Sequence, residues 1–145
     1  MSDVVFTVEA STVNSTRVDV CAGSHAFSID EPVRMGGTDA GPNPVEYLLG
    51  ALAGCLNVTG HLVAKEMGFT IESMDIRLEG NLDPLVFMGK KTGVRAGFKE
   101  IRVWIDMKSD ASEEKLHQWA QAVELRCPVS DNLHNSTPLK IAFAR

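Results

Sequence analysis

The chain has 145 residues, of which 44% are hydrophobic and 23% charged. Both fractions are close to the average for globular proteins, which argues against a disordered or fibrous chain. The formal net charge is −5 and the basic residues are scattered along the sequence. Because a surface that binds phosphates is usually basic, we expect no nucleic-acid partner. A chain of this length forms one ordinary domain, so we predict a single domain over residues 1–145.

The first ten residues, MSDVVFTVEA, have no basic region followed by a long apolar region. No continuous run reaches the eighteen or so apolar residues that span a bilayer. The three cysteines, Cys21, Cys55 and Cys127, are too few and too widely spaced for a secreted disulfide scaffold. We therefore expect a cytoplasmic protein with no membrane partner, in which each cysteine is a core thiol or a reactive one.

Alternating apolar and polar residues predict three short antiparallel strands in the first thirty residues. The apolar positions are Val4, Phe6 and Val8, followed by a pair around residues 18–20 and another at 26–29. Residues 31–44 are rich in glycine and proline and predict a structured loop. That loop leads into the longest helix of the chain, with Asn43 as its N-cap, Pro44 at its first position and its end near Gly68.

The second half of the chain alternates strands and helices without a βαβ repeat. Strands are predicted over residues 71–78 and 101–107, separated by a long loop at 80–97. Ser112 begins a helix, a short helix follows Cys127, and a last strand covers residues 139–143. The resulting order, βββ-α-ββ-α-α-β, is an α+β arrangement with antiparallel sheets, which disfavours the parallel-sheet nucleotide folds.

The long helix is apolar or small nearly all round. On a helical projection Gly50, Gly54 and His61 share a narrow face, while most of the leucines and Cys55 cover a broad opposite arc. A 145-residue monomer has little chain to bury such a helix on every side, whereas a second copy supplies it. We therefore expect a homodimer, the alternative being a monomer whose two sheets enclose the helix.

Cys127 lies in the sequence R-C-P-V-S. Because Pro128 suits the first position of a helix, Cys127 falls near an N-cap, where free N–H groups favour a thiolate. The competing interpretation is that Cys-Pro only separates two helices. By itself, the apolar context of Cys55 favours a core thiol over a reactive one.

Two segments taken together are more specific than either cysteine. The run DEPVRMGGTDAGPNPVEYLLGALAGC, residues 30–55, and the run RCPVSDNL, residues 126–133, resemble the OsmC/Ohr superfamily, the relatives of osmotically inducible and organic hydroperoxide resistance proteins. This resemblance extends over essentially the whole chain. It implies an intertwined α+β homodimer with a long central helix and with active sites at the subunit interface.

The resemblance also implies an activity. Members of the superfamily reduce organic hydroperoxides with two cysteines and no metal or prosthetic group. On that basis Cys55 matches the peroxidatic thiol, which becomes a sulfenic acid, and Cys127 matches the resolving thiol, which condenses with it to a disulfide. A dithiol or a reductase would then restore the thiols.

The superfamily places an arginine and a glutamate near the reactive thiol, because apolar burial raises the pKa of a thiol. Here the glutamate is displaced: Val45 follows the Asn-Pro pair and Glu46 stands one position later. Nine residues of helix separate Glu46 from Cys55, about 13 Å, so Glu46 acts across a dimer interface or serves only the helix terminus. Arg17 is the first candidate for the arginine, and Arg34 is the second.

Two functions follow from these residues. The first is a thiol peroxidase with Cys55, Cys127, Glu46 and Arg17 as its catalytic set. The second, which the displaced glutamate keeps open, is a binding or redox-sensing thiol protein of the same fold with an apolar pocket at the dimer interface. The four histidines have no short metal-ligand spacing, so we expect neither metal nor cofactor.

Overall fold

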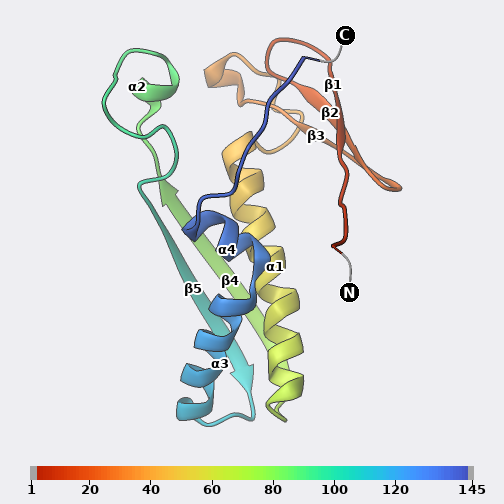
Figure 1. Ribbon diagram of the computed structural model, residues 1–145, viewed down its shortest axis with the longest axis vertical. Helices are drawn as coiled ribbons and strands as arrows, with labels where there is room; N and C mark the ends of the chain where they lie inside the picture. The colour runs from red at the N-terminus through yellow and green to blue at the C-terminus, as the bar shows by residue number, and fades with distance from the viewer. Residues whose placement is uncertain (1–2, 144–145) are drawn as a thin grey trace. The chain divides into compact units, whose positions relative to one another are not determined.

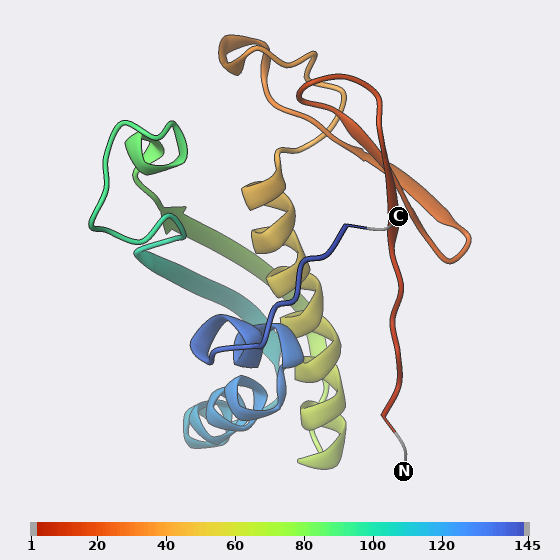
Figure 2. The same cartoon turned by 45° about the horizontal axis from the view of Figure 1, so that its top comes forward.

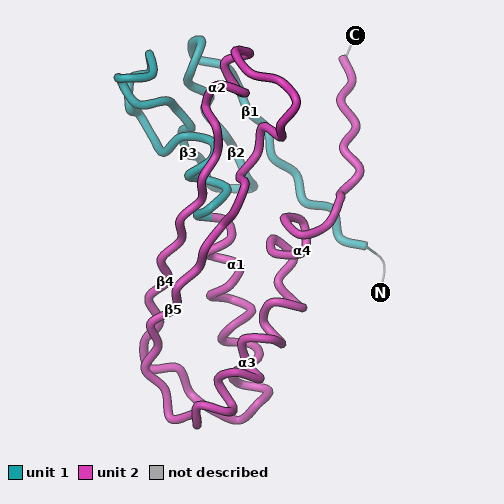
Figure 3. Tube along the Cα trace, turned by 90° about the vertical axis from the view of Figure 1, so that its left-hand side faces the viewer, with its two compact units in different colours: residues 1–50 teal, residues 51–145 magenta. Residues whose placement is uncertain are grey.

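The computed structural model describes residues 3–143, which divide into two compact units, residues 1–50 and residues 51–145 (Figure 3). The boundary lies within the longest helix, α1, which runs from Pro44 to Glu66. Each unit is described separately below. The predicted long helix is therefore present and starts at the predicted proline.

The first unit contains a three-stranded antiparallel sheet in the order β1-β2-β3. The strands are β1 (Glu9–Thr12), β2 (Val18–Ala22) and β3 (His25–Ile29), with β2 in the middle. A short 3₁₀ helix, η1 (Val33–Met35), lies in the loop that leads to α1. The hydroxyl of Tyr47 donates to the carbonyl of Ser28 at 2.8 Å, which ties the first turn of α1 to the end of β3.

The second unit contains a long two-stranded hairpin and two consecutive helices beside the rest of α1 (Figures 1 and 2). The hairpin strands are β4 (Ile71–Asn81) and β5 (Glu100–Ser109), which pair antiparallel. The loop between them, which we predicted to be irregular, holds one short helix, α2 (Pro84–Phe87). The helices are α3 (Glu113–Arg126), capped by Ser112 as predicted, and α4 (Pro128–His134).

Both ends of the chain differ from the prediction. Residues 3–8 form no strand, and the first strand is β1, residues 9–12. Residues 139–143, predicted as the last strand, have no regular structure either. A strand needs a partner for its N–H and C=O groups, and alternating apolar residues indicate the tendency to pair without providing that partner.

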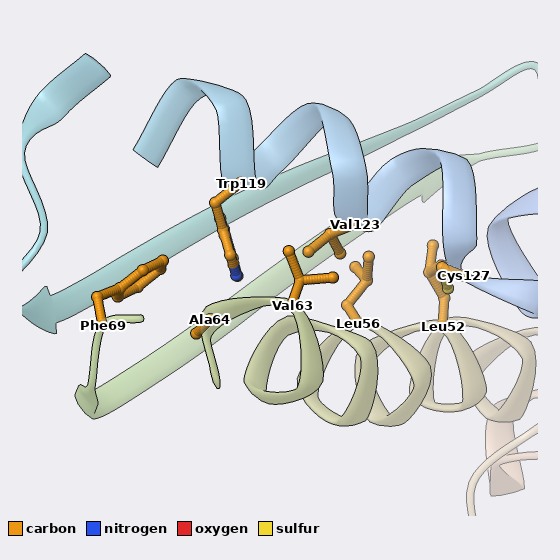
Figure 4. Close-up of a cluster of buried hydrophobic side chains, with 8 residues drawn as sticks. All are labelled: Leu52, Leu56, Val63, Ala64, Phe69, Trp119, Val123 and Cys127. Atoms are coloured by element: carbon orange, nitrogen blue, oxygen red, sulfur yellow. The ribbon is translucent and has the colours of Figure 1, made fainter. Parts of the chain in front are cut away.

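The core of the second unit lies between α1, α3 and the hairpin. Its buried members come from α1, from α3 and from the adjoining turns (Figure 4): Leu52, Leu56, Val63, Ala64, Phe69, Trp119, Val123 and Cys127. The inward-facing residues of β4 and β5, among them Ile76 and Ile105, pack against this cluster. The helical spacing of the apolar residues in α1 therefore selects the side that enters the core.

One glycine of α1 is needed for this packing. A Cβ added to Gly60 would lie 2.8 Å from the ring of Trp119, whose indole N–H donates to the Gly60 carbonyl at 2.8 Å. At Gly50 and Gly54, which share the narrow face of the predicted helix, a Cβ would meet no atom of the described chain within 4 Å. Of these three glycines of α1, Gly60 is therefore the one at which another part of the described chain approaches closely.

Helix α1 is long and apolar enough to cross a membrane by length and composition alone, with a mean hydropathy of 1.4 over its most apolar stretch. The core helix of a globular protein meets the same criterion. Leu52, Leu56 and Val63 of α1 are buried against the other elements of the second unit.

Candidate active site

Two sulfur atoms that are 72 positions apart in the sequence meet in the second unit. The Sγ of Cys127 lies 2.9 Å from the Sγ of Cys55. Cys55 belongs to α1 and is half-buried, whereas Cys127 lies between α3 and α4 and is 0% exposed. Both thiols are reduced. One cysteine is therefore reachable from solvent and the other stands directly behind it.

The chain places Cys127 by ending one helix and beginning the next at the same residue. The N–H of Cys127 donates to the carbonyl of Val123, which closes α3, and the carbonyl of Cys127 accepts the N–H of Asp131, which opens α4. Pro128 occupies the first position of α4. Because proline has no N–H to satisfy, it suits that position, and the predicted N-cap role of Cys127 is confirmed.

The electrostatics of Cys127 are set mainly by burial. Loss of solvent raises the pKa of the Cys127 thiol, and its contact with Cys55 raises it further. The N–H of Ser130, which donates to the Cys127 sulfur at 3.4 Å, acts in the opposite direction. The raising effects prevail, so Cys127 keeps its proton under conditions in which an exposed thiol starts to lose it.

Apolar side chains surround the sulfur pair. Leu52 lies one turn before Cys55 on α1 and next to Cys127 in Figure 4, and Val123 precedes Cys127 by one turn on α3. Val129 and Leu133 of α4 pack against the same cluster. The sulfur pair is therefore continuous with the hydrophobic core.

The residues after Cys127 build α4. Ser130 is buried, and its hydroxyl and carbonyl both lie within hydrogen-bond distance of Nδ1 of His134, at 3.4 and 3.1 Å. The exposed carboxylate of Glu124 is 3.8 Å from Nε2 of the same ring. The SDNL segment thus fixes the start of α4, and Ser130 supplies the N–H that contacts the Cys127 sulfur.

Glu46 completes a capping box at the start of α1. Its carboxylate accepts the N–H of Asn43 at 2.9 Å, and the side-chain oxygen of Asn43 accepts the N–H of Glu46 at 2.9 Å. This reciprocal pair satisfies two N–H groups that a helix terminus would otherwise leave open. The carboxylate of Glu46 is therefore already engaged within the first unit.

The two candidate arginines differ in their surroundings. The guanidinium of Arg17 donates to the carboxylate of Asp19 at 2.9 Å. The hydroxyl of Ser28 and this guanidinium together lower the pKa of Asp19. Arg34 lies in the last turn of η1 and is exposed. Arg17 is thus held on the sheet by a carboxylate.

Asp30 was not among the sites proposed from sequence, yet it organises the glycine-rich loop. It is fully buried and accepts the N–H and the hydroxyl of Thr38, at 2.9 and 2.6 Å, and the N–H groups of Glu31 and Ala40. The Thr38 hydroxyl first, and after it the N–H groups of Ala40 and Thr38, hold the pKa of Asp30 well below its usual range. A Cβ on Gly37 would lie 1.8 Å from the Glu31 carbonyl oxygen, so only glycine fits there. In the sequence, the position of Asp30 before the Gly-Gly-Thr segment was the signal that could have predicted this role.

The remaining candidates are simpler. Cys21 is exposed on β2. Among residues 3–143 no group of three or more histidine, cysteine or acidic side chains has the arrangement of a metal site.

Comparison with known proteins gives the family. The model of the OsmC-like protein family matches residues 37–142, well over half of the chain. The chain belongs to the OsmC-like protein family. Its resemblance in sequence to the OsmC/Ohr superfamily is thereby confirmed at the family level.

Individual relatives are distant. The chain is 29% identical to the uncharacterized protein YmaD of Bacillus subtilis over 83% of this chain and 79% of that protein. It is 28% identical to a hydroperoxide reductase of Mycoplasma pneumoniae over 81% of this chain and 80% of that protein. The crystal structure of an OsmC-like protein from Mycoplasma pneumoniae superimposes with a TM-score of 0.81 at 21% identity, over 93% of this chain and 91% of that one. The last comparison establishes the α+β OsmC-like fold.

Proposed function

We propose that this OsmC-like protein is a thiol-dependent peroxidase that reduces organic hydroperoxides, with Cys55 as the peroxidatic and Cys127 as the resolving cysteine. The observation that carries the proposal is the 2.9 Å separation of their sulfur atoms. A relative from Mycoplasma pneumoniae that bears the name hydroperoxide reductase supports it.

The difference in exposure between the two cysteines supports the proposed roles. A hydroperoxide must reach the attacking sulfur, and Cys55 is the member of the pair that retains exposed surface. Cys127 is fully buried, so it meets an oxidised Cys55 before any dissolved thiol does. The apolar side chains around the pair, such as Leu52 and Leu56, favour an alkyl hydroperoxide over a strongly hydrated oxidant.

The reaction proceeds in two steps. The Cys55 thiolate attacks the outer peroxide oxygen, the O–O bond breaks, and an alkoxide leaves and takes up a proton from water. The Cys127 sulfur then attacks the Cys55 sulfenic acid, which releases water and forms the disulfide. Two external thiols, from a dithiol or a reductase of the cytoplasm, return the disulfide to the reduced pair.

We infer that the active form is a homodimer. In this chain Val58 on α1 is 68% exposed, and Leu62 beside it is half exposed. Phe6 and Phe143, in the two end segments predicted as strands, are 90% and 98% exposed. Apolar surface of this extent favours cover by a second copy, and partner strands would give the end segments the hydrogen bonds that they lack. Sedimentation velocity should give twice the mass of one chain. Val58→Asp should shift the measured mass toward that of a single chain.

The test of the activity is peroxide consumption in the presence of dithiothreitol. We expect the wild-type protein to consume cumene hydroperoxide catalytically and Cys55→Ser to be inactive. Cys21→Ser, an exposed cysteine outside the pair, is the matched control and should keep the wild-type rate. No consumption by the folded wild type would refute the peroxidase. Equal loss of activity in Cys55→Ser and Cys21→Ser would refute the assignment of the activity to Cys55.

A second function is supported by one observation. The candidate helper residues Glu46 and Arg17 are each engaged, with Asn43 and Asp19 respectively. A thiol protein that binds an apolar ligand or senses oxidants needs neither of them. This alternative predicts that the wild-type protein forms at most one disulfide per chain with excess peroxide and does not turn over with dithiothreitol.

A further inference from the structure

The thiol of Cys127 is positioned to act on Cys55 while both are reduced. The Cys127 sulfur donates its hydrogen to the Cys55 sulfur at 2.9 Å, and itself accepts the N–H of Ser130. Cys127 is the N-cap of α4, so its position is fixed by backbone hydrogen bonds on both sides. A donor held in this way loses little freedom when it bonds to an anion.

Charged groups that adjoin Cys127 in α3 and α4 are engaged with other partners. From α3, Arg126 binds the carboxylate of Glu66. From α4, Asp131 accepts from the Asn135 side chain and His134 bonds to Ser130. The residues of β4 and β5 that pack against this cluster are apolar, among them Ile76 and Ile105. In the described part of the second unit, then, no cation is hydrogen-bonded to either sulfur.

We propose that the Cys127 thiol is the hydrogen-bond donor that stabilises the Cys55 thiolate, so that Cys127 activates the nucleophile before it resolves the sulfenic acid. Val45 stands where the superfamily resemblance calls for a helper carboxylate, and the neighbouring Glu46 is used by the capping box. The Cys127 thiol therefore supplies, within the same unit as Cys55, the stabilising group that neither Val45 nor Glu46 provides.

The direction of proton sharing is consistent with this role. Burial and the contact with Cys55 raise the pKa of Cys127. When one proton leaves the pair, Cys127 is therefore the member that retains its own, and the charge resides on Cys55. A thiol donor next to a thiolate strengthens in an apolar setting, because water does not compete for the bond.

The same proton completes the second chemical step. After the hydroperoxide has converted the Cys55 thiolate to a sulfenic acid, the Cys127 S–H and the sulfenic S–OH combine. The S–S bond forms, the S–O bond breaks, and the thiol proton leaves with the hydroxide as water. The peroxide steps rest on the proposed function, but stabilisation of the thiolate requires no peroxide.

The experiment measures the alkylation rate of Cys55 by iodoacetamide as a function of pH, in a Cys21→Ser background, with peptide mass mapping to count Cys55 alone. Three proteins are compared: the wild-type pair, Cys127→Ser, which keeps a donor, and Cys127→Val, which keeps the volume without a donor. We expect the alkylation midpoint to stay close to the background value in Cys127→Ser. In Cys127→Val we expect it to rise by about one pH unit, a roughly tenfold smaller thiolate fraction below the midpoint.

Circular dichroism checks the fold of each variant, and Cys127→Ala replaces the valine if that variant is unfolded. An unchanged or lowered midpoint without the donor would overturn the proposal, as would an equal rise in the serine and valine variants. Arg17→Gln is the competing arm: a rise there with none in Cys127→Val would assign the stabilisation to the arginine. If the alkylation midpoints change as expected while cumene hydroperoxide is not consumed, stabilisation of the Cys55 thiolate by Cys127 is supported and the peroxidase activity is refuted.

Discussion

The two units of the chain handle polar groups in different ways. In the first unit, charged side chains are bound by neighbours: Asp30 accepts four hydrogen bonds from the loop, and Arg17 is held by Asp19. In the second unit, the sulfur pair lies in an apolar cluster, where Cys127 contacts Cys55 and accepts the N–H of Ser130. Charge in the first unit is used to hold a loop in shape. In the second unit the contacts of the sulfur pair lie in apolar surroundings, which strengthen each of them.

The largest expected effect separates core packing from surface packing in the second unit. Trp119 is buried against Gly60, whereas Trp104 on β5 is exposed. We expect Trp119→Ala to lower the free energy of unfolding by about 3–5 kcal/mol, because it leaves a cavity and removes the indole hydrogen bond to the Gly60 carbonyl. Trp104→Ala should cost far less. Urea denaturation measures both, and similar losses would show that the cluster is not the stabilising core.

The second prediction concerns the loop of the first unit. Asp30→Asn keeps the shape of the side chain but removes the charge that Thr38 and Ala40 stabilise. We expect its Tm at pH 7 to fall by about 3 °C or more, while Asp39→Asn, an exposed loop control, stays near the wild type.

The pH dependence of Tm tests the same hydrogen bonds of Asp30. The pKa of Asp30 is lowered in the folded protein, so its contribution to stability is complete above the unfolded value of 3.8 and is lost as the pH falls toward the folded value. The difference in Tm between wild type and Asp30→Asn should therefore shrink below about pH 4. A difference that grows on acidification would contradict the assigned hydrogen bonds.

The smallest expected effect on stability distinguishes a capping role of Glu46 from a role in assisting Cys55. Asn43 and Glu46 form a capping box, so Asn43→Ala should lower the free energy of unfolding by about 1 kcal/mol and Glu46→Ala by somewhat less. Glu46→Gln should have the smallest effect, because glutamine can complete the box. Thermal unfolding measures these differences. If Glu46 also assists Cys55, the peroxidase rate of Glu46→Gln drops well below that of Asn43→Ala despite its higher stability.

Local signals in the sequence predicted the main elements correctly. Asn43-Pro44 and Ser112 mark the two long helices, because capping and the fixed φ of proline act within one turn. Cys127-Pro128 marks the start of α4 for the same reason. The resemblance of residues 30–55 and 126–133 identified the family and paired the two cysteines that the structure brings together.

What the sequence did not reveal depends on distant contacts. The alternation at Val4–Val8 and at residues 139–143 is that of a strand, but strand formation needs a partner edge that local pattern does not supply. In the sequence, Gly60 does not differ from the other small residues of α1. Its missing Cβ is necessary because the ring of Trp119, 59 residues away, packs against it. The capping role of Glu46 was visible in its spacing from Asn43, whereas the partner of Arg17 became clear only from its contact with Asp19.

The most direct test of the account is a single turnover. The reduced protein is mixed with one equivalent of cumene hydroperoxide, quenched by alkylation of the remaining thiols, and analysed by intact mass and peptide mapping. The account predicts a chain that carries one alkyl group, on Cys21, and that has lost two hydrogen atoms in the disulfide between Cys55 and Cys127, while the peroxide is gone. Peroxide left unreacted, or a disulfide that joins Cys21 in place of Cys127, would contradict it.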